Sequence, residues 1–481
     1  MKKKIAIVGG GVGGLALASR LAHKGYPVEV FEKLPSCGGR NNLITEGGFK
    51  FDTGPSFVLM PDFFGEVFSY CNERLEDHLS LKVLEVSYKL FYPDSDTFTV
   101  YRDPVRTREE IERLQKGSSA GFDKFIKATT VLYEKVRPLL YRCFTPSACF
   151  NPLLWPLLKD IRPFQSYWNM VKEFFPNEKL CYAFTFEAMF MGVSPFEAPA
   201  FYSIISYTDH VQKIYHPLGG MYEIPRALEA LAKRFGAKFH YNCEIKNIRP
   251  EKSTLAINAN GLDVSFDSVA INADYAYAQE SLLSRNLKSY RYSCSVYLIY
   301  LGLKRKVKGL EHHNLFFAKD LVANLDQIFK TGNVPYDPSF YIHVPTVTDS
   351  SLAPQGKDIL YILVPVPNLK KAKSDIEASE EALRKTIFEK VSKIIGSNLE
   401  DLIEVERHFY PRDFLDRYNI KYGATFGLAH NLTQSAFFRP ANFDQRIKNL
   451  HYVGASVQPG GGLPVVIASS RITADLIERG F

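Results

Sequence analysis

The sequence predicts an α/β protein made of two interleaved domains. At 481 residues the chain is longer than a single compact core usually supports. The first residues alternate an apolar strand, a glycine-rich turn and a helix, a pattern typical of a βαβ unit in a parallel sheet. A second strand followed by a glycine turn lies near the C-terminus. We therefore expect one domain to be assembled from segments far apart in the sequence.

The N-terminal unit has the order and spacing of a dinucleotide-binding site. A β-branched run over residues 4–8 leads into G-x-G-x-x-G at Gly9, Gly11 and Gly14, and a helical pattern follows. The first glycine allows a tight turn, the second lets the backbone approach a pyrophosphate, and the third lets helix and strand pack closely. A second strand ends at Glu32, whose carboxylate can accept hydrogen bonds from ribose hydroxyls. These features predict a Rossmann-like unit.

The segments that follow identify the dinucleotide. Gly38-Gly39-Arg40 comes five residues after Glu32, and Asp52-Thr53-Gly54-Pro55 comes soon after. They resemble the E-x(5,6)-G-G-R and D-x-G-P segments of the amine oxidase and carotenoid desaturase superfamily of FAD enzymes. The resemblance implies that FAD is bound, that the Gly-Gly-Arg loop lies against the pyrophosphate and flavin, and that the Gly54-Pro55 turn borders the ring.

A C-terminal segment completes the expected flavin site. Residues 450–455 form a strand that runs into a glycine turn, and Leu463-Pro464 opens an amphipathic helix. Proline is well placed in a first helical turn because its missing N–H would be unpaired there. The helix N-terminus can stabilise negative charge on a reduced flavin. The segment is similar to the terminal V-G-A-x-x-x-P-G-x-G-x-P stretch of phytoene desaturases.

The chain contains one dinucleotide fingerprint. Without a second G-x-G-x-x-G for NAD(P)H, we expect substrate electrons to reach the flavin directly and to pass on to a quinone or oxygen. No cysteine follows Cys294, which excludes the C-terminal cysteinyl–flavin bond of some amine oxidases. The FAD is therefore expected to be held non-covalently.

The FAD-binding domain is expected to comprise residues 1–75, 215–285 and 425–481, and the substrate-binding and membrane-associating α+β domain residues 76–214 and 286–424. The residues expected to bind FAD are Gly9, Gly11, Gly13, Gly14, Glu32, Gly39, Arg40, Gly54, Pro55, Ser56, Ile245, Gly454, Gly462, Leu463 and Pro464.

Over its full length the chain resembles bacterial carotenoid desaturases of the phytoene desaturase type, most closely the dehydrosqualene (4,4'-diapophytoene) desaturases. The residues that carry the resemblance include Tyr202-Ser203-Ile204-Ile205, His216 to Met221, and Thr433 to Pro440, which matches T-Q-S-x-x-x-R-P. The resemblance implies desaturation of a long apolar polyene. A hydride would leave an allylic carbon for flavin N5, and a neighbouring proton would be lost.

Two other oxidations and one non-catalytic role stay open. The segment Ser456 to Gly462 departs from the T-x-P-G-A-G of desaturases and looks more like carotenoid oxidases that form terminal aldehydes. Oxidation of a soluble amine is a weaker alternative. A flavin-binding escort that passes polyenes between membrane enzymes is disfavoured, because the segments expected to face the ring are intact.

Acid–base groups are few in the segments expected to border the substrate. They are Glu187, Asp209, His210 and His216, and a structural hydrogen bond is the more common role for such residues. We select Glu187 and His216 as tentative catalytic residues. No metal-ligand spacing is found, so no metal is expected.

The middle of the chain predicts contact with a membrane. Residues 144–175 combine both tryptophans and many phenylalanines with Lys159, Arg162 and Lys172, and the whole chain carries a net charge of +7. Aromatic residues flanked by basic ones suit a membrane interface. No apolar stretch is long enough to span a bilayer, and no nucleic-acid-binding motif is present. We expect peripheral attachment to the cytoplasmic face of the membrane.

Overall fold

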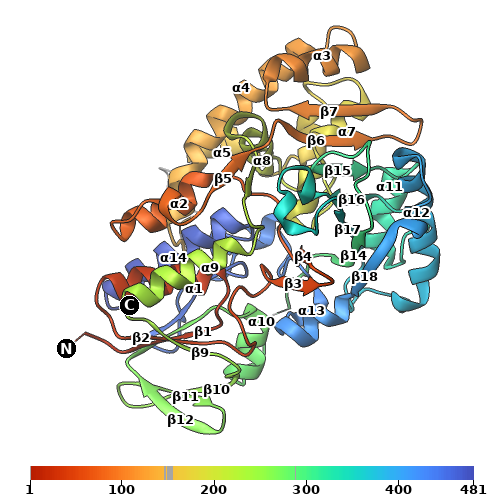
Figure 1. Ribbon diagram of the computed structural model, residues 1–481. Helices are drawn as coiled ribbons and strands as arrows, with labels where there is room; N and C mark the ends of the chain where they lie inside the picture. Colours follow the sequence, from red (N-terminus) through yellow and green to blue (C-terminus); the bar gives the residue numbers. More distant parts are fainter. Residues whose placement is uncertain (1, 146–147, 149–154, 288) are drawn as a thin grey trace.

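The computed structural model describes residues 2–145, 148, 155–287 and 289–481. Two sheets organise the molecule, a small parallel sheet near both chain termini and a larger mixed sheet beyond it (Figure 1). The arrangement confirms the predicted α/β class with a Rossmann-like domain built from discontinuous segments.

Five parallel strands form the smaller sheet, in the order β19-β13-β1-β2-β9. The strands are β1 (Ile5–Val8), β2 (Val28–Phe31), β9 (Lys238–His240), β13 (Ser268–Ile271) and β19 (Leu450–Tyr452). All four residues of β1 are buried, as expected for a parallel strand covered on both faces. The sheet thus joins three stretches of chain that are more than 150 residues apart in sequence.

Helices cover one face of this sheet, and a β-meander covers the other. Helix α1 packs against α9 and α14 on the first face (Figure 1). The apolar side chains of the meander share a core with those of β1 and β13 on the second face. The bounds are α1 (Val12–His23), α9 (Glu223–Arg234), α14 (Leu463–Glu478), β10 (Ile245–Pro250), β11 (Leu255–Ala259) and β12 (Leu262–Phe266).

The larger sheet has seven strands in the order β18-β14-β17-β16-β15-β6-β7, and only the β15–β6 pair is parallel. Side chains alternate between two cores: Leu298 and Tyr300 face a helical layer, whereas Ile299 and Leu301 face α12. The bounds are β6 (Val86–Phe91), β7 (Thr97–Tyr101), β14 (Ser295–Leu303), β15 (His313–Phe316), β16 (Phe340–His343), β17 (Asp358–Val366), β18 (Ile403–Phe409) and α12 (Glu380–Ile395).

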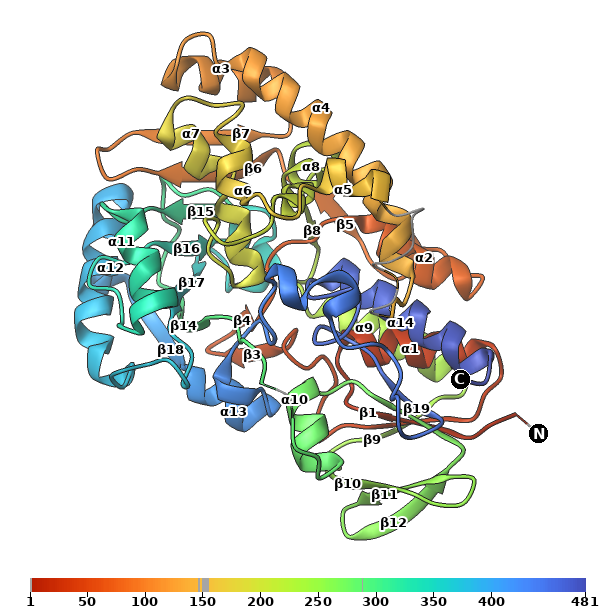
Figure 2. The ribbon, with the colours of Figure 1, turned by 180° about the vertical axis from the view of Figure 1, so that it is seen from behind.

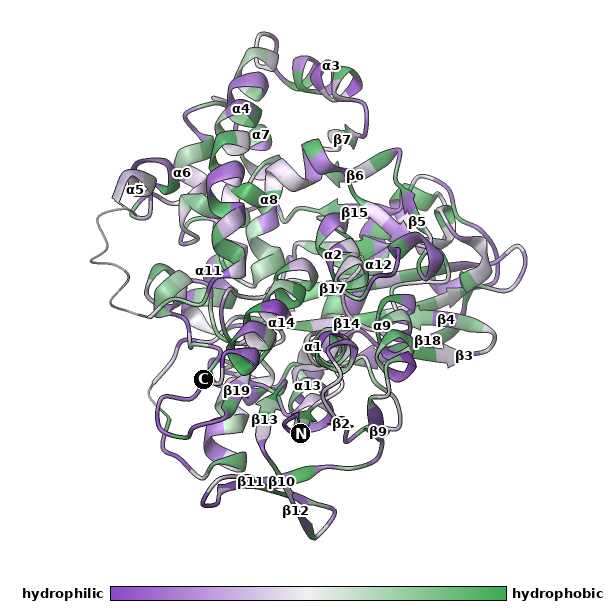
Figure 3. Cartoon of the chain, turned by 90° about the vertical axis from the view of Figure 1, so that its left-hand side faces the viewer, coloured by the Kyte–Doolittle hydropathy of each residue, from purple (hydrophilic) through white to green (hydrophobic). Residues whose placement is uncertain are grey.

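The remaining elements complete the layers, as Figure 2 shows from behind. They are β3 (Leu43–Glu46), β4 (Phe49–Asp52), α2 (Pro61–Tyr70), β5 (Leu81–Val83), α3 (Pro104–Leu114), α4 (Ser119–Val136), α5 (Trp155–Ile161), α6 (Tyr167–Val171), α7 (Glu178–Ala183), α8 (Ile204–Tyr207), β8 (Tyr215–Pro217), α10 (Tyr275–Tyr277), α11 (Leu321–Asp326) and α13 (Pro411–Tyr418). Hydrophobic residues concentrate in central strands such as β14 and β17 (Figure 3). Among the described residues, no helix is both long and apolar enough to cross a membrane.

The aromatic segment 144–175 divides into two parts. Residues 146–147 and 149–154 lie outside the described residues. Tyr167, Trp168 and Phe175 are buried in the core, where Trp168 packs against Tyr182. Trp155 and Phe164 are 58% and 93% exposed. The side chains of the buried part therefore pack against the protein itself, and the predicted membrane contact stays a prediction for the exposed part.

Arg439 holds the C-terminal loops together from inside. It is 2% exposed, and its guanidinium donates hydrogen bonds to the backbone carbonyls of Val457 (3.2 Å), Gln434 (3.2 Å) and Ala455 (2.7 Å). Burial lowers its pKa to about 10. No carboxylate is among its hydrogen-bond partners in the described chain, so backbone carbonyls accept its hydrogen bonds, while the nearby Asp274 carboxylate also favours its charge.

We expect R439K to destabilise the protein by about 2–3 kcal/mol, because lysine cannot reproduce a fork of hydrogen bonds to several carbonyls. Thermal unfolding of the flavin-loaded protein, followed by circular dichroism, measures the effect. R479K, at an exposed position of the same C-terminal region, is the control. Equal unfolding midpoints for R439K and the wild type would contradict this role.

Candidate flavin and substrate site

The glycine turn after β1 is shaped by close backbone packing. Gly9 has a φ of +101°, which glycine adopts without strain, and Gly11 is the N-cap of α1. A side chain at Gly14 would place its Cβ 2.4 Å from the Gly9 carbonyl oxygen. Gly14 therefore lets α1 press against the strand, while Gly9, Gly11 and Gly13 line a cavity above the turn.

Glu32 closes one end of this cavity directly after β2. Its two carboxylate oxygens accept hydrogen bonds from the backbone N–H groups of Gly10 (2.8 Å) and Leu34 (2.9 Å). Burial raises the pKa of the carboxyl, and the two N–H groups act in the opposite direction. The side chain is thus fixed in place at the edge of the sheet, where a ribose is held in dinucleotide-binding folds.

Asn272, which sequence reasoning missed, locks the glycine turns from the neighbouring strand. It follows β13, and its amide nitrogen donates to the Gly9 carbonyl at 3.1 Å. Its Oδ1 lies 2.9 Å from where a Cβ at Gly13 would stand, and 2.8 Å from the same point at Gly454. One amide therefore requires glycine in two segments more than 400 residues apart. The only sequence feature that could have indicated this role is its position at the end of a strand, β13, which pairs with the strand before the fingerprint.

The second glycine loop packs directly on the first. The Gly38 N–H donates to the Gly10 carbonyl at 2.8 Å, and Arg40 donates to the Thr425 carbonyl at 2.6 Å. Burial lowers the pKa of Arg40, and the nearby Asp274 carboxylate acts in the opposite direction. The guanidinium lines the cavity and offers positive charge there.

Two helix N-termini converge at the cavity. Gly462 is the N-cap of α14, and Leu463 and Pro464 form its first turn beside the cavity. A Cβ at Gly13, in the first turn of α1, would lie 3.0 Å from the Cγ1 of Val466 in the first turn of α14. Each N-terminus offers unpaired N–H groups and a positive dipole end. This pair suits a ligand that carries phosphates and a ring able to become anionic.

His430 is a second residue that sequence reasoning missed. Its Nε2 accepts a hydrogen bond from the Gly461 N–H at 3.1 Å, so its Nδ1 carries the proton that faces the Met191 carbonyl at 3.2 Å. Burial lowers its pKa well below the ordinary value. His430 is thus a neutral imidazole that lines the cavity and supports the turn before α14. An isolated histidine in an irregular segment carries no sequence signal for this role.

The residues present fit FAD. Of the fifteen expected ligands, all except Gly14 line one continuous cavity, and Gly14 packs beneath it. The cavity runs from Ile245 at the start of β10, past Glu32 and the glycine turns, to Gly54, Pro55 and Ser56. Along the cavity, the polar end at Glu32 suits a ribose, and the two helix N-termini that follow suit the pyrophosphate and the ring of a dinucleotide.

The same cavity continues as an apolar arm into the larger domain. Its walls come from the helical layer and from strands of the seven-stranded sheet. Representative lining residues are Phe57, Phe186, Met189, Phe190, Leu298, Leu315, Phe317, Leu321, Tyr341 and Leu363. Among the described residues, the charged groups that line the cavity, Glu32, Lys33, Arg40, Glu244, Asp274 and Arg417, all belong to its cofactor-binding part.

None of the four expected acid–base residues lines this cavity. Glu187 is fully buried and accepts hydrogen bonds from Ser206 (2.8 Å) and Tyr167 (3.3 Å), and burial raises its pKa to about 7. Burial also raises the pKa of Asp209 well above its ordinary value. His210 contacts Tyr88 at 3.4 Å, and His216 lies among other histidines. The structure therefore places Glu187 and His216 outside the lining of this cavity.

We expect E32Q to raise the FAD dissociation constant at least about tenfold. Glutamine replaces one accepting oxygen by an NH2 group, which opposes one of the two backbone N–H donors, and its side chain also lacks the charge. Flavin fluorescence during dilution of the loaded protein measures retention. E85Q, at an exposed position, is the control, and equal retention by E32Q would contradict the assignment.

Comparison with known proteins agrees with this site. The family model described as flavin containing amine oxidoreductase matches residues 12–478. The zeta-carotene-forming phytoene desaturase of Myxococcus xanthus is 39% identical, with 98% of this chain and 93% of that protein covered. The 4,4'-diapophytoene desaturase (4,4'-diaponeurosporene-forming) of Staphylococcus haemolyticus is 36% identical, with 99% of each covered.

Solved structures share the fold at low sequence identity. Wild-type putrescine oxidase bound to putrescine aligns with a TM-score of 0.67 at 15% identity, covering 100% of this chain and 99% of that one. An oxidoreductase from Methanosarcina mazei aligns with a TM-score of 0.64 at 18% identity, covering 99% and 100%. With the matching family model and the glycine-lined cavity, these relationships show that the chain is an FAD-dependent oxidoreductase that belongs to the flavin-containing amine oxidoreductase family.

Proposed function

We propose that this chain is an FAD-dependent desaturase of a long apolar polyene in carotenoid biosynthesis, of the phytoene or 4,4'-diapophytoene type. The observation that carries the proposal is the apolar arm that opens from the flavin cradle. A hydrocarbon needs such a channel, because it offers no group for hydrogen bonding and binds only where apolar surface replaces water. The desaturases from Myxococcus and Staphylococcus support the same substrate class.

The uncharged lining of the apolar arm favours a polyene substrate over a soluble amine. A soluble amine is a cation, and its recognition calls for a carboxylate or an aromatic cage beside the flavin. No charged side chain lines the arm in the described part of the chain. The relatives at 35–39% identity are named as desaturases, which favours double-bond formation over aldehyde formation, although Ser456 to Gly462 departs from the desaturase pattern.

The residues of the chain bind, orient and exclude water. When bound, FAD supplies the hydride acceptor for such an oxidation. The two helix N-termini and Arg40 would hold the dinucleotide, and His430 fixes the Gly461 turn at the cavity wall. The apolar walls keep water away from the reacting carbons. The electron acceptor that reoxidises the flavin is proposed to be a quinone or oxygen.

We expect anaerobic mixing of the flavin-loaded protein with liposomes containing phytoene or 4,4'-diapophytoene to bleach the flavin and to produce structured polyene absorption bands. The reason is that electrons can reach only the bound flavin when oxygen is absent. Stopped-flow visible spectroscopy measures both changes. The faster of the two substrates identifies the chain length.

Putrescine, supplied under the same conditions, is the control and is expected to leave the flavin oxidised. An unchanged spectrum with both polyenes, or bleaching by the amine, would contradict the proposal. Product formation only in the presence of oxygen, with oxygen in the product, would instead indicate aldehyde formation.

We further propose that the protein attaches peripherally to the cytoplasmic face of a membrane, from which the polyene is taken. Trp155 and Phe164 project from α5 and the loop after it, with exposed fractions of 58% and 93%. Lys159 and Arg162 accompany them. Exposed aromatic side chains with basic neighbours bind the interface of an anionic bilayer.

We expect the double variant W155S/F164S to bind anionic liposomes at least about tenfold more weakly than the wild type, because insertion of two large apolar side chains is lost. Vesicle co-sedimentation at several salt concentrations measures the effect. The variant Y336S/L262S removes two residues that are 75% and 72% exposed elsewhere and serves as the control. Equal binding by W155S/F164S and the wild type would count against this surface.

A further inference from the structure

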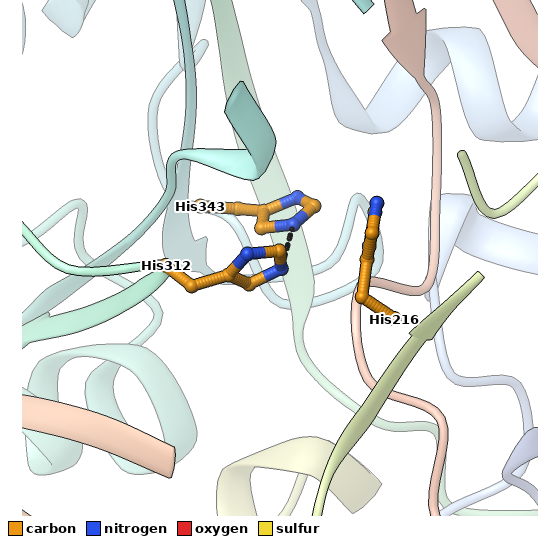
Figure 4. Close-up of side chains that lie close together, drawn as sticks. All are labelled: His216, His312 and His343. Atoms are coloured by element: carbon orange, nitrogen blue, oxygen red, sulfur yellow. Dashed lines mark hydrogen bonds between the residues drawn. The ribbon is translucent and has the colours of Figure 1, made fainter. Parts of the chain in front are cut away.

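Three buried histidines from distant segments meet at the junction between the two sheets. His216 lies in β8, His312 immediately precedes β15, and His343 ends β16. One ring nitrogen from each lies within 4.8 Å of the others, and the Nε2 atoms of His312 and His343 are 3.0 Å apart. Figure 4 shows these two rings one above the other, with the His216 ring beside them. The cluster is separate from the cavity-lining residues.

Hydrogen bonding accounts for two of the three rings. The Nδ1 of His312 lies 2.7 Å from the Thr348 hydroxyl oxygen, which fixes this ring, and its Nε2 pairs with that of His343. His216 is 0% exposed, yet neither of its ring nitrogens has a hydrogen-bond partner among the residues that the structure describes. A neutral imidazole carries one N–H donor and one lone pair. Leaving both unpaired in a buried place is unfavourable, so a hydrogen-bonded histidine cluster does not explain His216.

The chemical state of the rings suits a metal ligand. Burial lowers the pKa of His216 to about 4, and it lowers the pKa values of His312 and His343 well below the ordinary range. Burial thus favours the neutral form of the rings, the form in which an imidazole offers a lone pair to a metal ion. Imidazole nitrogens prefer zinc, copper, nickel or iron over magnesium or calcium.

We propose that His216, His312 and His343 form a binding site for a divalent transition metal ion, with Zn²⁺ as the reference ion. Ligands at the usual Zn–N distance in a tetrahedron stand about 3.4 Å apart, close to the 3.0 Å between His312 and His343. The His216 nitrogen lies within 4.8 Å of the other two, so its side chain would move by at most about 1.4 Å to bind the ion. The carboxylate of Asp349, 4.0 Å from the His216 Nε2, can supply a fourth ligand or balance the charge.

The position of the site indicates a structural role. Strand β8 leads into α9 beneath the FAD-binding sheet, whereas β15 and β16 belong to the large sheet. An ion held by all three histidines would tie these parts together. His313, next to His312, stacks on Phe57 of the cavity wall with ring centroids 3.9 Å apart. Metal binding therefore stabilises the junction that shapes the apolar arm.

The test uses the FAD-loaded full-length protein, purified without a histidine tag and dialysed against a chelator. Zn²⁺ or Co²⁺ is added, unbound ion is removed on a desalting column, and metal content is measured by mass spectrometry. We expect about one ion per chain, a raised unfolding midpoint, and Co²⁺ absorption bands at longer wavelength than those of the flavin.

Variants locate the ion. H216Q and H343Q are expected to bind it at least about tenfold more weakly, while H240Q, which removes a half-exposed histidine, is expected to bind as the wild type does. The FAD-to-protein ratio reports whether each variant is folded. K82Q is expected to bind more tightly, because the Lys82 ammonium beside Thr348 opposes a cation.

Two outcomes would overturn the proposal. The first is wild-type protein that retains no ion and shows no thermal shift with Zn²⁺, as expected if a water molecule alone completes the cluster. The second is H216Q and H343Q that bind as the wild type does, which would place the ion on the surface. If both variants lose FAD, the Co²⁺ spectrum and the thermal shift of the wild type decide alone.

Discussion

The architecture depends on one close approach of backbones that only glycine permits. At Gly14, a single methyl group would collide with the Gly9 carbonyl oxygen, so α1 could not lie against its strand. Once this contact exists, the N-terminus of α1 points into the space above the sheet, and the neighbouring loops can pack on it. Asn272 then binds the Gly9 carbonyl and stands against Gly13 and Gly454. The flavin cradle is therefore a set of interlocking backbone surfaces, with few side chains between them.

The apolar arm follows from how the two sheets are connected. The chain leaves the parallel sheet after the cradle and returns to it twice, so the larger sheet is held against the open side of the flavin site. The strand β14 alternates apolar residues toward both of its faces, and one face forms a wall of the cavity. A substrate that enters there meets the cofactor at the end of an apolar channel. The fold thus supplies the dehydrated path that a hydrocarbon substrate requires.

Local chemistry predicted the parts of the site that depend on backbone conformation. Residue type and spacing alone predict the positions that serve local backbone geometry, namely Gly9, Gly11, Gly14, Glu32 and Pro464. Asn272, His430 and Arg439 act through contacts made only after folding, and neither their residue type nor their spacing announces those contacts. The aromatic run 144–175 shows the same limit, because composition alone does not separate the buried Trp168 from the exposed Phe164. Histidines 216, 312 and 343 likewise have no ligand spacing, since three distant segments of the chain bring them together.

In the described part of the chain, no charged side chain lines the apolar arm. Oxidation by a bound cofactor does not require one there. A charged group in the apolar arm would carry water with it, and water would compete with the polyene and with reactive carbon centres. Glu187 is buried behind the lining, where burial raises its pKa to about 7 and the hydrogen bonds from Ser206 and Tyr167 act in the opposite direction. The neutral His430 supports the flavin turn by a hydrogen bond without adding charge. Among the described residues, charged groups thus stay out of the apolar arm, and electron transfer is left to the cofactor.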